Sequence, residues 1–533
     1  MSKLPDLWQD GLAAGWQVVD ASQPGADLAL ACDVVIVGSG AGGGMTAELL
    51  AQAGLSVVLV EEGGLHSSRD FNLRESEAYP QLYQESANRL TADKGITILQ
   101  GRSVGGSTTV NWASCFRTPA DTLAWWRSHH RLTQMDDAAL QPWFERAEAR
   151  LNISAWEAAP NANNALLAAG CDKLGIPHAR IRRNVKGCWN LGYCGTGCAT
   201  NAKQGMLVTT IPTALAAGAR LLTRVRVRQL LLNPARTRAE GIVGDALQPD
   251  GVHASGRQVR VKARQVVLAA GAIGTPALLL RSRAPDPWQH LGKRTFLHPV
   301  VLSGGLFRQQ VEGFNGAPQS VYSDHFLHTQ PIDGPLGFKL EVPPVHPLIM
   351  AATLPGLAAD HQRLMQNLPH WQITLALMRD GFHPDSAGGS VRLRSDGSPV
   401  LDYPLNDTLW EAARRALLQM AEIQFAAGAR AVMPVHEDAA LATTLPQVRR
   451  MIAALPMQTL RTRVVSAHVM GGAMMSHDER SGVVDQLGRH WQLDNVTVID
   501  GSVFPTSIGA NPQLSVYALS LRAADALRQR LQG

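Results

Sequence analysis

A glycine-rich turn near the start of the chain has the residue types and spacing that hold a dinucleotide pyrophosphate. Gly38, Gly40 and Gly43 form a GxGxxG pattern around Ser39. These glycines allow a tight turn, a close approach of phosphate to the backbone, and close packing of helix on strand. Glu61 ends the next apolar run, where a carboxylate can accept hydrogen bonds from an adenosine ribose and disfavours NADP. A glycine-rich turn without a ligand is the alternative.

Three of the six cysteines, Cys188, Cys194 and Cys198, are clustered in the sequence. Neighbouring glycines would let a loop fold back so that three thiolates converge on one metal ion or iron–sulfur cluster. Three thiolates are one short of the four that the common cubane needs, so a [3Fe–4S] cluster or a further, non-cysteine ligand would be required. Structural thiols, or a disulfide between Cys194 and Cys198, are the alternatives.

The glycine turn needs a parallel sheet to position it, and four apolar runs predict strands of that sheet. Residues 33–37 and 56–60 flank a predicted helix at 45–54, which gives a β-α-β unit. Runs at 265–270 and 496–500 predict two more strands. Because these strands are far apart in the sequence, the nucleotide-binding domain must be discontinuous, and the inserted segments form a second domain.

The region between about 300 and 455 carries a different pattern. Alternating residues at 390–394 and 400–403 flank the turn Ser395–Ser398, which is typical of an antiparallel hairpin. Residues 408–427 predict a long amphipathic helix.

Composition predicts a compact globular protein and argues against nucleic-acid binding. The 533 residues are 45% hydrophobic and 17% charged, with a formal charge of +5 and no long basic stripe. The sequence shows neither a secretory signal pattern nor about 18 consecutive apolar residues. We therefore expect a cytoplasmic protein, with peripheral association on the inner face of a membrane as an open alternative.

Three distal segments resemble the glucose-methanol-choline (GMC) oxidoreductase family. Residues 101–111 are similar to its first signature and residues 271–279 to its second, although Arg283 stands after Ser282 where the family has glycine. The third segment resembles the family's C-terminal histidine, DGS and NP elements, in the same order, at 466–472, 500–505 and 510–512.

This resemblance implies a mixed α/β and α+β fold and a division into domains. A glutathione-reductase-like FAD-binding domain would comprise residues 30–300 and 456–533, with inserted loop or cap segments near 120–200. A substrate-binding domain built on an antiparallel sheet would comprise residues 301–455.

The resemblance also implies a catalytic pair, His468 and Asn511, facing the flavin N5 and the substrate hydroxyl. A hydride leaves carbon easily only as the alcohol proton is removed or strongly hydrogen-bonded, and histidine is the usual base near neutral pH. Without the resemblance, His468 would be interpreted as a core histidine. Glu341 is interpreted as a surface or salt-bridged acid. The remaining histidines that we considered are treated as structural: His129, His130, His298, His346 and His383.

The cofactor implied is FAD without a covalent link, because Val110 stands where covalent members carry the attached histidine. The expected FAD-binding residues are Gly38, Ser39, Gly40, Gly43, Glu61, Arg102, Gly105, Gly106, Ser107, Asn111, Val227, Gly271, Asp500 and Gly501.

Residues 197–204 and 209–218 look most like the long-chain alcohol oxidase and dehydrogenase branch of the family, which implies a medium- or long-chain aliphatic alcohol as substrate. A sugar or sterol alcohol, or a catalytically dead FAD-fold binding protein, are the alternatives. Oxygen, a quinone or a cytochrome could accept the electrons. The cysteine segment is also similar to that of FAD sugar dehydrogenases, whose [3Fe–4S] centre passes electrons to a cytochrome.

Overall fold

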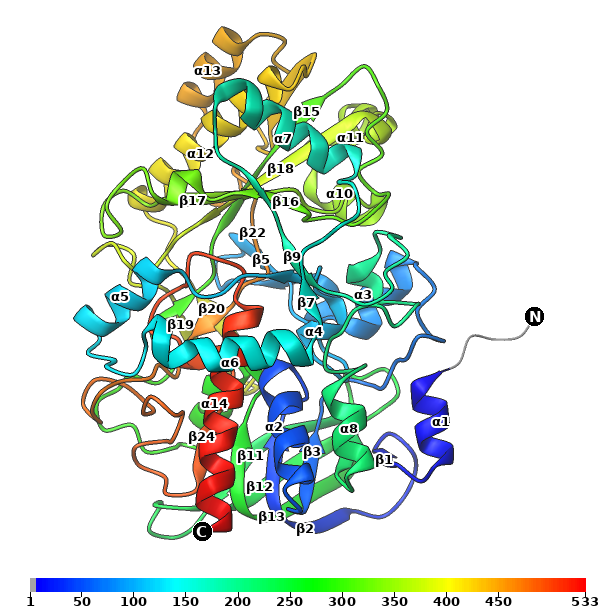
Figure 1. The fold of residues 1–533 in the computed structure, drawn as a ribbon, viewed down its shortest axis with the longest axis vertical. Coiled ribbons are helices and arrows are strands. Elements are labelled where there is room, and N and C mark those ends of the chain that lie inside the picture. Colours follow the sequence, from blue (N-terminus) through cyan, green and yellow to red (C-terminus); the bar gives the residue numbers. More distant parts are fainter. Residues whose placement is uncertain (1–5) are drawn as a thin grey trace.

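The computed structural model describes residues 6–533, and two large sheets dominate this part of the chain (Figure 1). One sheet lies in the lower half of the view and carries the GxGxxG turn. The other lies in the upper half and has an antiparallel core. The predicted α/β and α+β class is confirmed.

The first sheet has eight strands in the order β1-β10-β3-β2-β13-β12-β11, with β24 paired to β13. The pairs among β1, β10, β3, β2, β13 and β24 are parallel, whereas β11 and β12 run antiparallel to their neighbours. The strands span Gln17–Asp20 (β1), Leu28–Val37 (β2), Val57–Val60 (β3), Arg220–Thr223 (β10), Val225–Leu232 (β11), Ala239–Leu247 (β12), Ala254–Leu268 (β13) and Val496–Val498 (β24).

The four predicted strands of this sheet are present as β2, β3, β13 and β24. Their C-terminal parts are apolar because helices cover the sheet there, and residues 34–37 and 265–268 are buried. The covering helices α2, α8 and α14 lie in front of the sheet in Figure 1 and span Ala41–Gln52, Thr210–Ala216 and Gln513–Gln532. Helix α2 begins at Ala41, before the predicted start, because the glycine turn opens directly into it.

The second sheet has nine strands in the order β4-β5-β22-β15-β18-β17-β16-β8, with β21 paired to β15. All pairs are antiparallel except β22 with β5. The strands span Arg89–Leu90 (β4), Ile96–Ile98 (β5), Ala179–Arg180 (β8), Val300–Leu306 (β15), Val321–Ser323 (β16), Phe338–Glu341 (β17), Trp371–Met378 (β18), Ala431–Pro434 (β21) and Val464–Ser466 (β22). This sheet thus takes strands from outside the predicted range 301–455.

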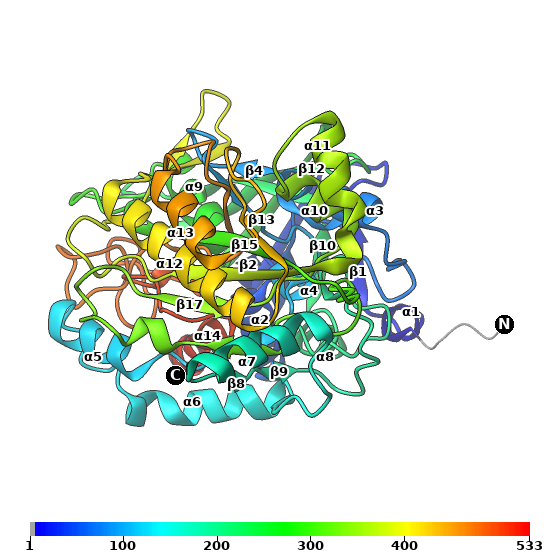
Figure 2. The ribbon, with the colours of Figure 1, turned by 90° about the horizontal axis from the view of Figure 1, so that it is seen from above.

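Alternating side chains of this sheet enter two cores. Val301, Ala376 and Met378 pack with α12, α7 and α13. Helices α12 and α13 lie at the top of Figure 1 and toward the viewer in Figure 2. Leu302 and Ile373 point the other way. The helices span Ala162–Leu174 (α7), Asp407–Ala426 (α12) and Leu445–Ala454 (α13), and the predicted long helix and hairpin are confirmed as α12, Ser390–Leu393 (β19) and Pro399–Asp402 (β20).

Smaller elements fill the remaining space. The helices are Leu7–Ala13 (α1), Glu75–Leu82 (α3), Ser107–Val110 (α4), Ala120–His129 (α5), Asp137–Arg150 (α6), Gly271–Arg281 (α9), Pro347–Thr353 (α10) and Ala358–Gln366 (α11). The strands are Ser114–Cys115 (β6), Ile153–Ser154 (β7), Arg182–Asn184 (β9), Thr295–Phe296 (β14) and Met470–Gly471 (β23). Within residues 6–533, none of the helices combines the length and apolar character needed to span a bilayer.

Candidate active site

The turn between β2 and α2 leaves an open cradle at the N-terminus of α2. Gly38 has a φ of +98°, and a Cβ there would lie 2.3 Å from the Ala269 carbonyl oxygen. A Cβ at Gly43 would lie 1.8 Å from the Gly38 oxygen, so these positions exclude side chains. At Gly40 the nearest atom to a Cβ is 3.9 Å away, and no side chain caps the helix. The first-turn N–H groups can therefore bind a pyrophosphate in this space.

Ser39 and Glu61 join this turn to the end of β3. The Ser39 N–H and hydroxyl donate to Glu61 Oε2 at 3.0 and 2.5 Å, and the Gly63 N–H donates to Oε1 at 2.8 Å. Burial raises the pKa of Glu61. The carboxylate is fixed in place, and its remaining lone pairs can accept from ribose hydroxyls.

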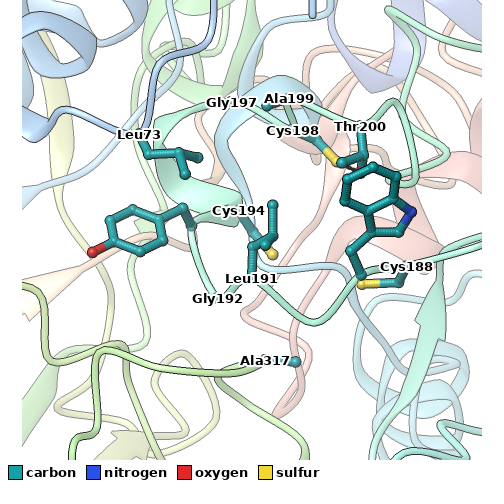
Figure 3. A pocket seen from close by; sticks show the side chains of 12 residues that line it. Leu73, Cys188, Leu191, Gly192, Cys194, Gly197, Cys198, Ala199, Thr200 and Ala317 are labelled. Atoms are coloured by element: carbon teal, nitrogen blue, oxygen red, sulfur yellow. Dashed lines mark hydrogen bonds between the residues drawn. The ribbon is translucent and has the colours of Figure 1, made fainter. Parts of the chain in front are cut away.

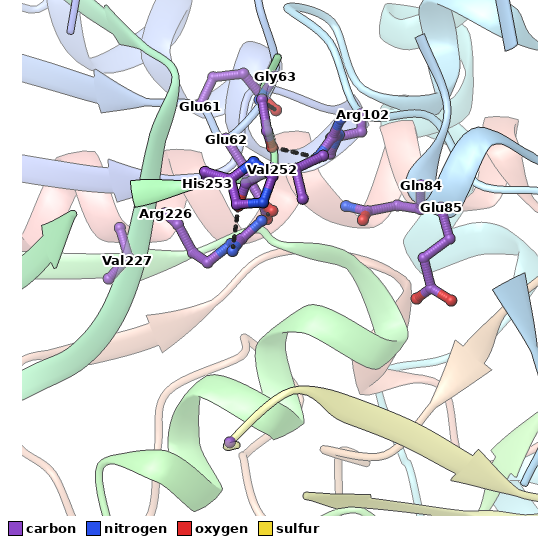
Figure 4. A network of polar contacts seen from close by, with 12 residues as sticks. Glu61, Glu62, Gly63, Gln84, Glu85, Arg102, Arg226, Val227, Val252 and His253 are labelled. Carbon is purple, nitrogen blue, oxygen red and sulfur yellow. Dashed lines mark hydrogen bonds and ion pairs between the residues drawn. The ribbon is translucent and has the colours of Figure 1, made fainter. Parts of the chain in front are cut away.

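Charged residues beside Glu61 support the same region (Figure 4). Arg226 donates from Nε to Glu62 Oε1 at 2.9 Å, and Arg102 donates from Nη1 to the Gly251 carbonyl at 2.7 Å. Although burial opposes them, Arg226 and Arg102 hold the pKa of Glu62 below its usual range. Val227, next to Arg226 on β11, is buried.

The segment 101–111 lies directly against the glycine turn. The Gly105 N–H donates to Ser39 Oγ at 3.0 Å, and a Cβ at Gly106 would lie 2.8 Å from Gly40 Cα. The Ser107 hydroxyl accepts from the Gly101 N–H at 3.0 Å. Asn111, the last residue of this segment, donates from Nδ2 to Gln513 Oε1 at 2.5 Å.

Hydrogen bonds to Asp500 connect residues 271–279 with residues 500–505. Its Oδ2 accepts from the Gly271 N–H at 2.9 Å and from the Thr275 hydroxyl at 2.5 Å, and its Oδ1 accepts from the Ser502 N–H at 2.8 Å. Burial raises the pKa of Asp500. Gly271 has a φ of +80°, with no atom nearer than 3.8 Å to a Cβ, so the space beside it is also open.

His468 lies in the loop between β22 and β23, beside a second histidine. Its Nδ1 is 3.3 Å from Nδ1 of His298, whose Nε2 accepts the Gly509 N–H at 3.0 Å. The proton of a neutral His298 ring must then be on Nδ1, where it is donated to His468, and a neutral His468 carries its own proton on Nε2.

The surroundings keep His468 neutral. The side chain of His468 is partly exposed to solvent, but protein atoms surround most of its imidazole ring. This burial lowers the pKa of His468 to about 3, and the charge of Lys339 acts in the same direction. Burial also lowers the pKa of His298, whose backbone N–H is held by Asp380 Oδ1 at 3.1 Å.

Asn511 is buried and is held from two sides. The Lys339 ammonium donates to Asn511 Oδ1 at 3.1 Å, and Asn511 Nδ2 donates to Glu341 Oε2 at 3.1 Å. Lys339 and Glu341 form a buried ion pair at 3.0 Å. The structure thus confirms the salt-bridged interpretation of Glu341 and contradicts a surface position.

Two family models, both described as GMC oxidoreductase, match this chain, one over residues 58–300 and the other over residues 384–520.

The chain belongs to the GMC oxidoreductase family.

Relatives of this GMC oxidoreductase cover most of its length. A long-chain-alcohol oxidase of Arabidopsis thaliana is 26% identical over 94% of this chain and 70% of its own. An uncharacterised GMC-type oxidoreductase of Mycobacterium tuberculosis is 32% identical over 98% of this chain and 81% of its own. The protein is a FAD-dependent oxidoreductase, and the open cradle described above fits that cofactor.

Solved structures show the same fold. A variant of formate oxidase from Aspergillus oryzae RIB40 has a TM-score of 0.68 at 17% identity, over 95% of this chain and 100% of its own. Pyridoxine 4-oxidase from Mesorbium loti has a TM-score of 0.67 at 20% identity, over 93% of this chain and 99% of its own.

The three clustered cysteines line one pocket of the GMC oxidoreductase (Figure 3), and all are free. Each sulfur accepts from a different protein group: Cys188 from the Asn190 N–H at 3.4 Å, Cys194 from Arg183 at 3.7 Å, and Cys198 from the Lys203 N–H at 3.4 Å. Among residues 6–533, no group of three or more His, Cys, Asp or Glu side chains is arranged to hold a metal ion. The predicted [3Fe–4S] cluster therefore finds no support.

Lys203 connects the cysteine loop to the first signature. Its buried ammonium donates to the carbonyls of Thr109 and Asn111, each at 2.7 Å, and of Cys194 at 2.9 Å. The sequence gave no signal for this contact, because backbone carbonyls from separate segments meet only in the fold.

Replacing Lys203 by methionine should lower the stability by about 3 kcal/mol, because three buried carbonyls would lose a charged donor. Thermal unfolding of the FAD-loaded protein measures the loss. The exposed Lys186 lies in the same loop, so Lys186→Met is the matched control. Equal unfolding temperatures for the two variants would contradict the role of Lys203.

Proposed function

We propose that this GMC oxidoreductase oxidises a medium- or long-chain aliphatic alcohol to the aldehyde, with FAD held non-covalently. The carrying observation is that the charges at the site pair with one another: Lys339 pairs with Glu341, and the neighbouring Arg379 pairs with Asp121 at 2.7 Å. Both site histidines have lowered pKa values, so they are neutral near pH 7. Such a site favours an uncharged substrate, because a carboxylate or ammonium entering it would lack a free counter-charge.

Two aromatic rings beside Lys339 also favour an apolar substrate. Phe116 and Tyr322 stack edge to face with ring centroids 4.8 Å apart, beside Lys339. The relatives named as long-chain-alcohol oxidases point the same way.

His468 and Asn511 would act on the substrate oxygen. FAD, when bound, supplies the acceptor for the hydride. His468 presents its Nε2–H, and Asn511 has one Nδ2 proton left after its bond to Glu341, so both can donate to one oxygen. The hydroxyl proton is released to solvent, and the two N–H donors stabilise the negative charge that this leaves on oxygen. Hydride then leaves carbon as the carbon–oxygen double bond forms. This assignment replaces the general-base role expected from the sequence, which requires an unprotonated Nε2.

Alcohol preference is tested by mixing the oxidised protein anaerobically with a panel of alcohols and following flavin absorbance. We expect 1-decanol to reduce the flavin at least tenfold faster than glucose at equal concentration. Faster reduction by glucose would assign the protein to a sugar alcohol instead. Re-oxidation of the reduced protein by oxygen, a quinone or a cytochrome then identifies the acceptor.

Non-covalent attachment is tested by acid precipitation. Val110 is buried and aliphatic, and it cannot form a bond to the flavin. All of the yellow colour should appear in the supernatant after trichloroacetic acid treatment. Colour retained in the pellet would show a covalent link through another residue.

A further inference from the structure

The side chain of Asn511 sits in a closed ring of three polar groups. Lys339 Nζ lies 3.1 Å from Asn511 Oδ1 and 3.0 Å from Glu341 Oε1, and Asn511 Nδ2 donates to Glu341 Oε2 at 3.1 Å. Lys339 and Glu341 are alternate residues of β17, so they project from the same face of the sheet. Both are almost fully buried.

The ring fixes which end of the Asn511 amide faces which neighbour. An ammonium can only donate and a carboxylate can only accept, whereas an amide can do either, depending on its orientation. Lys339 therefore requires Oδ1 at its side, and Glu341 requires Nδ2. A flipped amide would set donor against donor and acceptor against acceptor.

Three neighbouring groups surround the Lys339 ammonium. It donates a hydrogen bond to Asn511 Oδ1, forms an ion pair with Glu341 Oε1, and lies over the Phe116 ring, 2.9 Å from the centroid. These contacts hold the ammonium in place beside Asn511. Burial lowers the pKa of Lys339 to about 8, and Glu341 opposes this shift, so the group remains charged at pH 7.

We infer that Lys339 and Glu341 are positioning residues that orient the Asn511 amide so that its free Nδ2 proton faces the substrate oxygen. This role rests on the proposed alcohol oxidation. Lys339 has a second effect, because its charge opposes protonation of His468. The other groups near the two histidines are Arg379, which also disfavours a proton on His298, and Asp380, which binds the His298 backbone.

A double-mutant cycle tests the inference with the alcohol that reduces the flavin fastest. Lys339→Met should lower kcat about tenfold or more in the parent protein. In an Asn511→Ala background, the same change should lower kcat less than twofold, because the group it positions is gone. Equal factors in both backgrounds would overturn the positioning role.

A double variant without either charge serves as the control for a folding defect. Lys339→Met alone leaves the Glu341 carboxylate buried without its partner, so Lys339→Met with Glu341→Gln removes both charges together. If the single variant fails to bind FAD, the cycle is run with this double variant, and the same two outcomes apply. Glutamine at 341 can still accept from Asn511, so Glu341→Gln alone should cost less than Lys339→Met.

The effect of the Lys339 charge on the pKa of His468 can be measured without substrate. The pKa of His468, followed by NMR of ring-labelled histidine in the FAD-bound protein and assigned with His468→Gln, should rise in Lys339→Met. An unchanged pKa would remove this part of the inference. A protein that no alcohol reduces but whose His468 pKa shifts as expected would contradict the proposed function, not the charge effect.

Discussion

Replacement of His468 by alanine is expected to lower the rate of flavin reduction by alcohol a hundredfold or more, with FAD still bound. The variant would lack the Nε2–H that donates to the substrate oxygen, and loss of one such donor typically costs ~10²–10³ in rate. The FAD-binding turn is built from other segments. Anaerobic stopped-flow absorbance measures the rate, and the visible spectrum measures FAD content.

Glutamine at this position separates a donor from a base. The amide of His468→Gln can donate from near the former Nε2 but has no basic nitrogen. We expect this variant to reduce its flavin at least tenfold faster than His468→Ala. A glutamine variant as slow as the alanine variant would support the general-base role expected from the sequence.

The contrast between these variants depends on His298. Its Nε2 accepts the Gly509 N–H, which directs its own proton to His468. The φ of His298 is +45°, an uncommon conformation for a residue other than glycine. Asp380 holds this backbone by accepting the N–H groups of Leu297 and His298 at 2.9 and 3.1 Å. The loops that contain His298 and Gly509 are far apart in the sequence, and together they determine which nitrogen of the His468 ring carries the proton.

Four strands of the nucleotide-binding sheet could be predicted from the sequence because their C-terminal ends are buried and appear as short apolar runs. The runs at 33–37 and 496–500 correspond to β2 and β24, which both pair with β13 in parallel. The second sheet was harder to predict. Its short edge strands, such as Arg89–Leu90 and Ala179–Arg180, carry no period of their own and are recruited by tertiary pairing.

The site was predictable where the motifs are local and not where partners come from distant segments. Gly38, Gly40 and Glu61 lie in one β-α-β unit, so their spacing alone places them together. Lys339 and Asn511 are 172 positions apart, and a single sequence contains no sign that they touch. The sequence indicates only a structural role for His298, because none of the family motifs includes it, whereas in the fold it contacts His468.

Replacement of Gly42 by alanine is expected to destabilise the protein by about 3 kcal/mol and to remove most of the bound FAD. A Cβ at this position of α2 would lie 1.6 Å from the Ile499 carbonyl oxygen and 2.7 Å from its carbon. Both atoms are backbone at the end of β24, next to Asp500, whose carboxylate binds the Gly271 N–H. The methyl group can be accommodated only if α2 and this strand end move apart, which would open the FAD cradle.

Gly44, two residues along the same helix, provides the matched control. A Cβ there would meet only side-chain atoms: Met206 Cγ and Thr210 Oγ1 at 2.8 Å and Met206 Cβ at 2.9 Å. These contacts are less severe than 1.6 Å to a backbone oxygen, and alanine is favoured over glycine inside a helix by about 1 kcal/mol. Gly44→Ala should therefore lose less stability than Gly42→Ala and keep its FAD. The ratio of flavin to protein absorbance and the thermal unfolding temperature compare the two variants. If Gly42→Ala retained FAD as well as Gly44→Ala does, the contact between α2 and the end of β24 would not be what holds the cradle in shape.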